Sequence, residues 1–269
     1  MIPVEIPWTR LPLRFDAARL CQDLSAIPDA AWTAHFNAND YAGGWSSVSL
    51  RSRSGRSDDI VPRGGAGEFS DTPLAARCPH LAEAAARFEF PKKSVRLLRL
   101  QAGSRVREHC DPDLGLADGE VRIHVPLLTN DRVEFVVANR RLLLAEGEAW
   151  YIDFSQPHRI ANDGDTDRIH LVIDGVANEW VLELIRRSVR ECVTESFEPE
   201  GAREFEAFRQ RVFEDPALQA SLLCIADPPR FCAAVVAAGE RCGFRFQLGD
   251  VESGLLRRQR EWSLGSSRL

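Results

Sequence analysis

The stretch EHCDPD (108–113), followed by VRIHVPLL (121–128), EAWYIDF (148–154) and DRIHLVID (167–174), decides the fold of this chain. VRIHVPLL and DRIHLVID both alternate strictly, with apolar residues on one face and Arg and His on the other. Side chains of a β-strand alternate between its two faces, so each segment predicts a strand with one apolar and one cationic face. Such strands suit a small barrel whose interior is a polar pocket.

The surrounding sequence adds further short strands separated by turns, at about 45–53, 94–101, 105–109, 120–128, 132–138, 141–145, 148–154, 158–162 and 167–174. Helices are expected at 13–24, with Asp16 as the cap, and at 80–89 and 177–191. The predicted fold is mainly β: a double-stranded β-helix of the jelly-roll or cupin-like kind, with flanking helices.

Three residues of the deciding stretch have the side chains of a metal site. His109 and Asp111 are two positions apart, so at the end of a strand they point to the same side, and His158 follows in a later turn. Taken alone, His-x-Asp is equally typical of a surface turn. Two imidazoles and one carboxylate on one face of an ion are typical of non-haem Fe(II), and they leave three positions for a 2-oxoacid and O2.

The cationic faces of the strands predict an anion in the same pocket. Arg122, His124 and Arg168 all point to the interior, and a buried lone charge is costly. A dicarboxylate bound by the Arg168 guanidinium would neutralise this charge and offset the cost of burying it. The alternative is that Arg168 forms a structural ion pair with Asp153 or Asp174. His124 is either a pocket residue or a core histidine, and His170 is expected to pack or hydrogen-bond near the pocket.

The segments RLLRLQAGSRVREHCD, VRIHVPLLTN and GEAWYIDFSQPHRIANDGDTDRIHLVID resemble the aspartyl/asparaginyl β-hydroxylase family, and in particular its bacterial proline-hydroxylase branch. A weaker resemblance extends it to roughly residues 1–190. These proteins are Fe(II)- and 2-oxoglutarate-dependent dioxygenases with a double-stranded β-helix fold. The resemblance implies a dioxygenase domain at 1–191.

The same resemblance implies roles for individual residues. It assigns Fe(II) to His109, Asp111 and His158, and the distal carboxylate of 2-oxoglutarate to Arg168. It places the remaining matched residues along the pocket: Arg122 and His124 beside the cosubstrate, Arg122 also beside the substrate, and Trp45 as a substrate-facing wall. Human-type members have Gly at the position of Asp111, whereas this chain carries the complete triad.

The implied activity is hydroxylation of an aliphatic carbon of an amino acid, with consumption of O2 and release of succinate and CO2. The substrate is free, N-substituted or borne on a peptide, and Arg122 is the candidate for its carboxylate. Two alternatives remain at this point. One is a non-catalytic cupin-like metal-binding protein whose C-terminal tail is an interaction module. The other is a metal-dependent hydrolase, for which no general base besides the ligands is evident.

Composition narrows the remaining classes. The net charge of −6 over 269 residues disfavours nucleic acid as a partner, and no apolar run is long enough to span a membrane. Seven cysteines without a Cys-x-x-Cys pair predict reduced thiols and a cytoplasmic location. Cys110 is expected to point away from the metal. The loop at 54–72 is expected to be either a lid over the pocket or a surface insertion, and His35 and His80 show no neighbours that suggest chemistry.

A second, all-helical domain is predicted at 203–269. Pro216 and the pair Pro228-Pro229 begin helices, each after an aspartate, Gly243 ends one, and Asp250 is expected to cap the last. This arrangement resembles the small helical leader-like family named for nitrogen-fixation clusters. The resemblance carries no catalytic residue and implies a docking role or a homodimer through these helices. A plain helical cap on the barrel is the alternative.

Overall fold

The computed structural model describes residues 6–62, 68–191, 196–197 and 199–255. The chain divides into two compact units, Met1–Ser196 and Phe197–Leu269, which are described separately below. The first unit contains all the residues predicted to carry chemistry.

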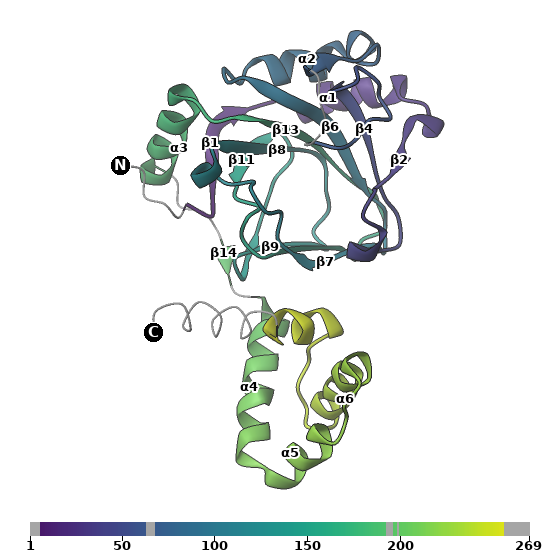
Figure 1. Cartoon of the computed structure of the whole chain (residues 1–269), viewed down its shortest axis with the longest axis vertical. Helices are drawn as coiled ribbons and strands as arrows, with labels where there is room; N and C mark the ends of the chain where they lie inside the picture. Colours follow the sequence, from purple (N-terminus) through teal and green to yellow (C-terminus); the bar gives the residue numbers. More distant parts are fainter. Residues whose placement is uncertain (1–5, 63–67, 192–195, 198, 256–269) are drawn as a thin grey trace. The chain divides into compact units, whose positions relative to one another are not determined.

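Two antiparallel sheets form the first unit and face each other (Figure 1). The larger sheet has the order β1-β11-β8-β13-β6-β4-β2, with β5 paired to β4. Its strands are β1 (Trp8–Arg14), β2 (Thr33–Ala34), β4 (Trp45–Ser52), β5 (Ser70–Asp71), β6 (Lys92–Leu100), β8 (Glu120–Leu128), β11 (Glu148–Ile152) and β13 (Arg168–Val176).

The smaller sheet has the order β14-β10-β9-β12-β7-β3. Its strands are β3 (Tyr41–Ala42), β7 (Arg105–His109), β9 (Val133–Val137), β10 (Arg140–Leu142), β12 (His158–Asn162) and β14 (Ser196–Phe197). The predicted mainly β, jelly-roll architecture is confirmed.

Alternation places the two faces of the larger sheet in different environments. Val121, Ile123, Val125 and Leu127 of β8 join the core under the helices, together with apolar residues of β13. Arg122 and His124, between them in the sequence, line the interior cavity instead. This confirms the division into an apolar outer face and a cationic inner face.

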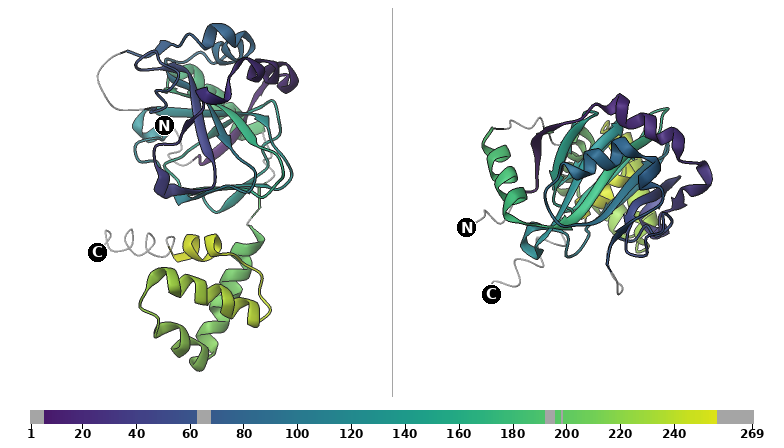
Figure 2. Two further views of the ribbon diagram at one scale, coloured as in Figure 1. Left: turned by 90° about the vertical axis from the view of Figure 1, so that its right-hand side faces the viewer. Right: turned by 90° about the horizontal axis from the view of Figure 1, so that it is seen from above.

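Helices cover the outer face of the larger sheet. The first unit contains α1 (Ala17–Gln22), α2 (Pro79–Ala86) and α3 (Glu179–Glu191), with short 3-10 turns at Asp23–Ala26, Asp29–Ala31, Ala38–Asp40, Ala75–Arg77 and Leu116–Asp118. Seen from above, α1 and α2 lie across the sheet (Figure 2), and buried Leu20 and Leu81 join its core cluster.

The prediction of a helix at 13–24 was partly wrong. Positions 13 and 14 belong to β1, while Asp16 caps the helix that follows by accepting a hydrogen bond from the Arg19 N–H. The strand was not predicted because Pro12 lies within it, and proline is rare inside strands. It is tolerated because β1 is an edge strand and its register with β11 shifts between Leu11 and Arg14. The strand expected at 141–145 is shorter, Arg140–Leu142.

The second unit consists of α4 (Glu200–Glu214), α5 (Pro216–Leu223), α6 (Pro228–Arg241) and a last helix described over 248–255. Its core contains Phe205, Phe208, Val235 and Phe246. Asp215 and Asp227 cap α5 and α6 as predicted. Asp250 lies in the first turn of the last helix, and its Oδ2 accepts the Gln247 N–H that precedes this helix, so Asp250 caps the helix as predicted.

No helix among the described residues is long and apolar enough to cross a membrane. The cytoplasmic location stays a prediction, as do the domain roles and the leader-like resemblance of the second unit. Residues 256–269 lie outside the described part of the chain.

Candidate metal centre and its pocket

A cavity of about 240 Å³ lies inside the barrel, between the two sheets. His109, Asp111, His158, Arg122, His124, Arg168 and Trp45 all line it. Every residue that the sequence assigned to the site is therefore brought together. Cys110 is absent from the lining, as alternation predicts.

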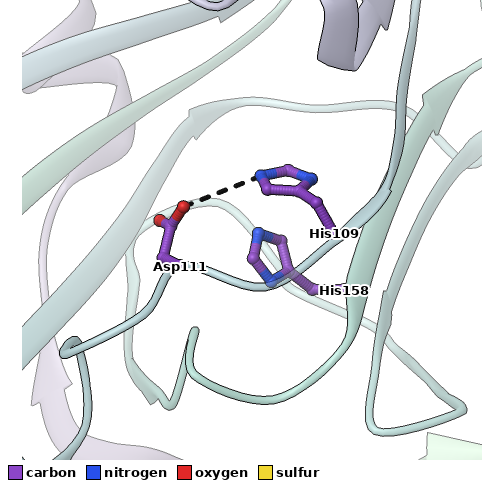
Figure 3. Close-up of side chains that lie close together, drawn as sticks. All are labelled: His109, Asp111 and His158. Carbon is purple, nitrogen blue, oxygen red and sulfur yellow. Dashed lines mark ion pairs between the residues drawn. The ribbon is translucent and has the colours of Figure 1, made fainter. Parts of the chain in front are cut away.

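The pairing of β7 with β12 brings the two histidines together. His109 and His158 are direct partners in this pair, and their ring centroids are 4.2 Å apart. Asp111 lies two residues beyond the end of β7, where its N–H donates to the Phe154 carbonyl oxygen at 2.8 Å. Figure 3 shows the three side chains converging, with His109 Nε2 3.8 Å from Asp111 Oδ1.

One ligand atom from each of the three residues lies within 4.8 Å of the other two. His109 Nδ1 is 2.8 Å from the Arg107 carbonyl oxygen, and His158 Nδ1 is 3.0 Å from that of Gln156. A carbonyl only accepts, so both Nδ1 atoms carry a proton, and Nε2 is then the ligand atom that a neutral ring offers. Burial lowers the pKa of His158 to about 3, which keeps that ring neutral at pH 7. This donor set fits a divalent transition metal.

Asp111 is held by a buried ion-pair network. Arg122 donates from Nη1 to Asp111 Oδ2 at 2.8 Å and from Nε to Asp174 Oδ1 at 2.5 Å. Arg96 and Ser94 donate to Asp174 Oδ2 at 2.7 and 2.6 Å. Burial alone would raise the pKa of Asp111, but the positive charge of Arg122 and its hydrogen bond outweigh that effect, so the pKa is lowered.

Arg168 has a different environment. It is 2% exposed, and its Nη2 lies 3.0 Å from His170 Nδ1. The alternative ion pair with Asp153 or Asp174 is not seen: Asp174 is bound by Arg96 and Arg122, and Asp153 accepts from Ser155. Among the described residues no carboxylate pairs with Arg168. Burial lowers the pKa of Arg168 to about 9, which still leaves it charged at pH 7.

The expectation that His35 has no functional neighbours was wrong. His35 lines the cavity and stacks on Trp45, with ring centroids 3.5 Å apart and planes at 10°. The His35 N–H donates to the Trp45 carbonyl oxygen at 2.8 Å, next to the pairing of β2 with β4. No local motif could have shown this, because the contact depends on the register of two strands. His80 contacts Asp23, away from the cavity.

The loop at 54–72 contributes to the cavity through Val61 and Pro62. The Ser57 and Asp59 carbonyl oxygens accept hydrogen bonds from Ser49 in β4, so this part of the loop is attached to the sheet. Positions 63–67 lie outside the described residues, and the lid role stays a prediction.

Fold and site together define a double-stranded β-helix protein in which His109, Asp111 and His158 could hold one metal ion. A family model described as aspartyl/asparaginyl beta-hydroxylase matches residues 12–177. The chain belongs to this family, and the match includes all seven residues assigned to the pocket.

A curated relative and several solved structures are also similar. L-proline cis-4-hydroxylase of Rhizobium meliloti (strain 1021) is 32% identical over 187 residues, 68% of this chain and 65% of that protein's length. A 2OG-Fe(II) oxygenase family oxidoreductase from Burkholderia pseudomallei is 16% identical, with a TM-score of 0.44, over 65% of this chain and 89% of that one. HygX from Streptomyces hygroscopicus, solved with nickel and 2-oxoglutarate bound, is 12% identical, with a TM-score of 0.40, over 64% and 84%.

Proposed function

We propose that this protein is an Fe(II)- and 2-oxoglutarate-dependent dioxygenase that hydroxylates an aliphatic carbon of an amino acid. In the overall reaction the substrate, 2-oxoglutarate and O2 give the alcohol, succinate and CO2. The observation that carries the proposal is one cavity that contains both the His109, Asp111 and His158 side chains at metal-binding spacing and a buried guanidinium without a carboxylate partner among the described residues.

In this proposal His109, Asp111 and His158 hold the iron, which supplies the oxidising chemistry once 2-oxoglutarate and O2 have bound. The protein itself contributes geometry and charge. Arg122 orients Asp111 through Oδ2 and leaves Oδ1, which faces His109, for the metal. The aromatic rings of Phe154 and Trp45 line the cavity and limit the access of water.

Arg168 anchors the distal carboxylate of 2-oxoglutarate. A buried guanidinium needs an anion, and the two ends of a 2-oxo diacid fit a metal at one end and a guanidinium at the other. His124 lies on the same wall as Arg168, and its Nε2 is buried without a partner.

The charges of the pocket suit a zwitterionic substrate. Arg96, Arg122 and Arg168 bring three positive charges, against the negative charges of Asp40, Asp111 and Asp174. A divalent metal and the 2-oxoglutarate dianion cancel each other, so the filled pocket would be balanced. A free amino acid keeps this balance if its carboxylate lies against a guanidinium and its ammonium against a carboxylate. Arg122 uses Nε and Nη1 on its two aspartates, so it would bind this carboxylate through Nη2.

An amino acid also has an ammonium group and a carbon chain. Asp40 lines the cavity and offers a carboxylate to the ammonium. The stacked His35 and Trp45 rings, with Leu98 and Ile160, provide the apolar surface against which the carbon chain would pack. A small cyclic or branched amino acid suits this combination.

The test is turnover. The Fe(II)-loaded protein is incubated with 2-oxoglutarate and a panel of free, N-substituted and peptide-borne amino acids, and succinate and a product heavier by one oxygen atom are measured. His158→Ala is the inactive control, and Asp165→Asn is a matched surface control, since Asp165 is 94% exposed. We expect coupled formation of both products with a free amino acid.

Other outcomes assign the alternatives. Turnover with peptides alone would place the substrate on a peptide and give the second unit a delivery role. Absence of 2-oxoglutarate consumption with every substrate would overturn the dioxygenase proposal and favour a non-catalytic cupin-like protein.

A further inference from the structure

Within the described part of the chain, Arg168 makes one polar contact with another side chain. Its Nη2 lies 3.0 Å from His170 Nδ1, and its Nε is buried without a hydrogen-bond partner. The guanidinium carbon lies 5.3 Å from the centroid of the Phe135 ring, and the His170 ring is parallel to the same ring within 4°. Phe135 is 1% exposed, so both groups are packed against a rigid surface.

The hydrogen-bonding pattern fixes the protonation of His170. A guanidinium only donates, so His170 Nδ1 must accept, and the proton of this ring lies on Nε2. Burial and the Arg168 charge keep the pKa of His170 well below its usual value, which agrees with a neutral ring.

His124 follows from His170. His124 Nδ1 lies 3.1 Å from the same Nδ1 atom of His170, which already acts as the acceptor. His124 Nδ1 therefore carries a proton and donates, so Arg168 and His124 share one acceptor. His170 is the point at which both groups are fixed.

We infer that His170 is a positioning residue for recognition of the distal carboxylate, an inference that rests on the proposed 2-oxoglutarate activity. Its lone pair holds Nη2 of Arg168 in one orientation, and the unpartnered Nε–H of Arg168 is left for the incoming carboxylate. The specificity for a 2-oxo diacid over a 2-oxo monoacid then depends on an imidazole that does not touch the cosubstrate itself.

Two isosteric changes separate this role from simple packing. In His170→Asn the amide oxygen can occupy the place of Nδ1 and accept from Arg168. In His170→Gln the polar atoms reach the place of Nε2, and the acceptor at Nδ1 is lost. Both variants keep a polar side chain of similar size in the same buried position.

The measurement compares two ligands on Ni(II)-loaded protein by calorimetry. 2-Oxoglutarate carries the distal carboxylate, whereas 2-oxovalerate has the same chain length without it. We expect His170→Gln to weaken binding of 2-oxoglutarate by about 10-fold or more, as is typical when a residue that orients a ligand-binding side chain is replaced. Binding of 2-oxovalerate should stay within about twofold, and His170→Asn should recover most of the loss.

Arg168→Met distinguishes the failure of this inference from that of the proposed function. If Arg168→Met weakens 2-oxoglutarate selectively and His170→Gln does not, the role of His170 is overturned while the anchor stands. If Arg168→Met has no selective effect, the proposed anchor itself is wrong. Equal weakening of both ligands by His170→Gln would show general structural damage and would also overturn the inference.

Discussion

The replacement Asp174→Asn tests the ion-pair network behind the metal site. Asp174 is 2% exposed and is a direct cross-strand partner of Arg122. Its two oxygens accept from Arg122, Arg96 and Ser94 at 2.5–2.7 Å. Asparagine keeps the shape but removes the charge, and its NH2 group must face one of these donors. The guanidinium groups of Arg96 and Arg122 are then left with Asp111 as the one nearby negative charge of this network.

The size of the effect follows from this geometry. Removing one charge from a buried, hydrogen-bonded pair typically costs about 3–5 kcal/mol, because the partner stays buried and uncompensated. We expect that loss in the free energy of unfolding at pH 7, measured by urea denaturation of the metal-free protein. The matched control is Asp165→Asn, since Asp165 is 94% exposed and lies 3.5 Å from Arg132, and it should cost less than about 0.5 kcal/mol.

The pH dependence gives a second check on the same variant. Burial would raise the pKa of Asp174, but Arg122 and Arg96 outweigh it and lower that pKa well below 3.8. A carboxyl with a depressed pKa in the folded state stabilises the protein above the pKa of the unfolded chain. Its contribution declines as the pH falls below the pKa of the unfolded chain, and it is gone once the pH is below the lower, folded-state value. The difference between wild type and Asp174→Asn should therefore stay constant down to about pH 4 and shrink below it.

Metal affinity should respond as well, because Arg122 orients Asp111. We expect about 10–100-fold weaker binding of Ni(II) to Asp174→Asn in a calorimetric titration. A well-folded variant with a stability loss below about 1 kcal/mol would refute the reasoning, since it would show that the network carries no net charge coupling.

Three further predictions concern other parts of the chain. Burial and the Arg168 charge lower the pKa of His170, so its neutral ring stabilises the metal-free protein above pH 6.5, and this contribution is lost as the pH falls. His170→Asn should therefore reduce the slope of unfolding free energy against pH by about 1.4 kcal/mol per pH unit below pH 6.5. Equal slopes for the variant and the wild type would contradict this prediction. Phe208→Ala should lower the free energy of unfolding of the second unit by about 3–5 kcal/mol and leave the Ni(II) affinity unchanged, since Phe208 is 1% exposed in a separate core. A loss below about 1 kcal/mol in thermal or urea unfolding would be inconsistent with that core. Gly147→Ala should lower the free energy of unfolding in urea by at least about 2 kcal/mol, because φ is +76° and the new Cβ would lie 2.2 Å from the Phe15 carbonyl oxygen. Gly119→Ala is the control: φ is +73° there, but the new Cβ meets no atom within 4 Å, so the loss should be smaller.

The inner face of the barrel could be predicted from sequence because strand alternation has a fixed period. In β8 and β13, Arg122, His124 and Arg168 stand between apolar neighbours that pack under the helices. The triad was recognisable for the same reason, since His109 and Asp111 are two positions apart.

The contacts between strands were not predictable. Asp174 meets Arg122 and Arg96 only because β13 lies between β8 and β6 in a particular register. His35 meets Trp45 for the same reason, beside the pairing of β2 with β4. Such contacts depend on three-dimensional pairing, which no local pattern contains. The sequence did not predict β1, because Pro12 is unusual within a strand and is tolerated here only at the edge of the sheet.

A crystal structure of the full chain grown anaerobically with Fe(II) and 2-oxoglutarate tests the central claim most directly. We expect one ion bonded to Nε2 of His109, Nε2 of His158 and Oδ1 of Asp111, with the distal carboxylate of 2-oxoglutarate against Arg168. An ion held by other residues, or a 2-oxoglutarate whose distal carboxylate lies away from Arg168, would contradict the account.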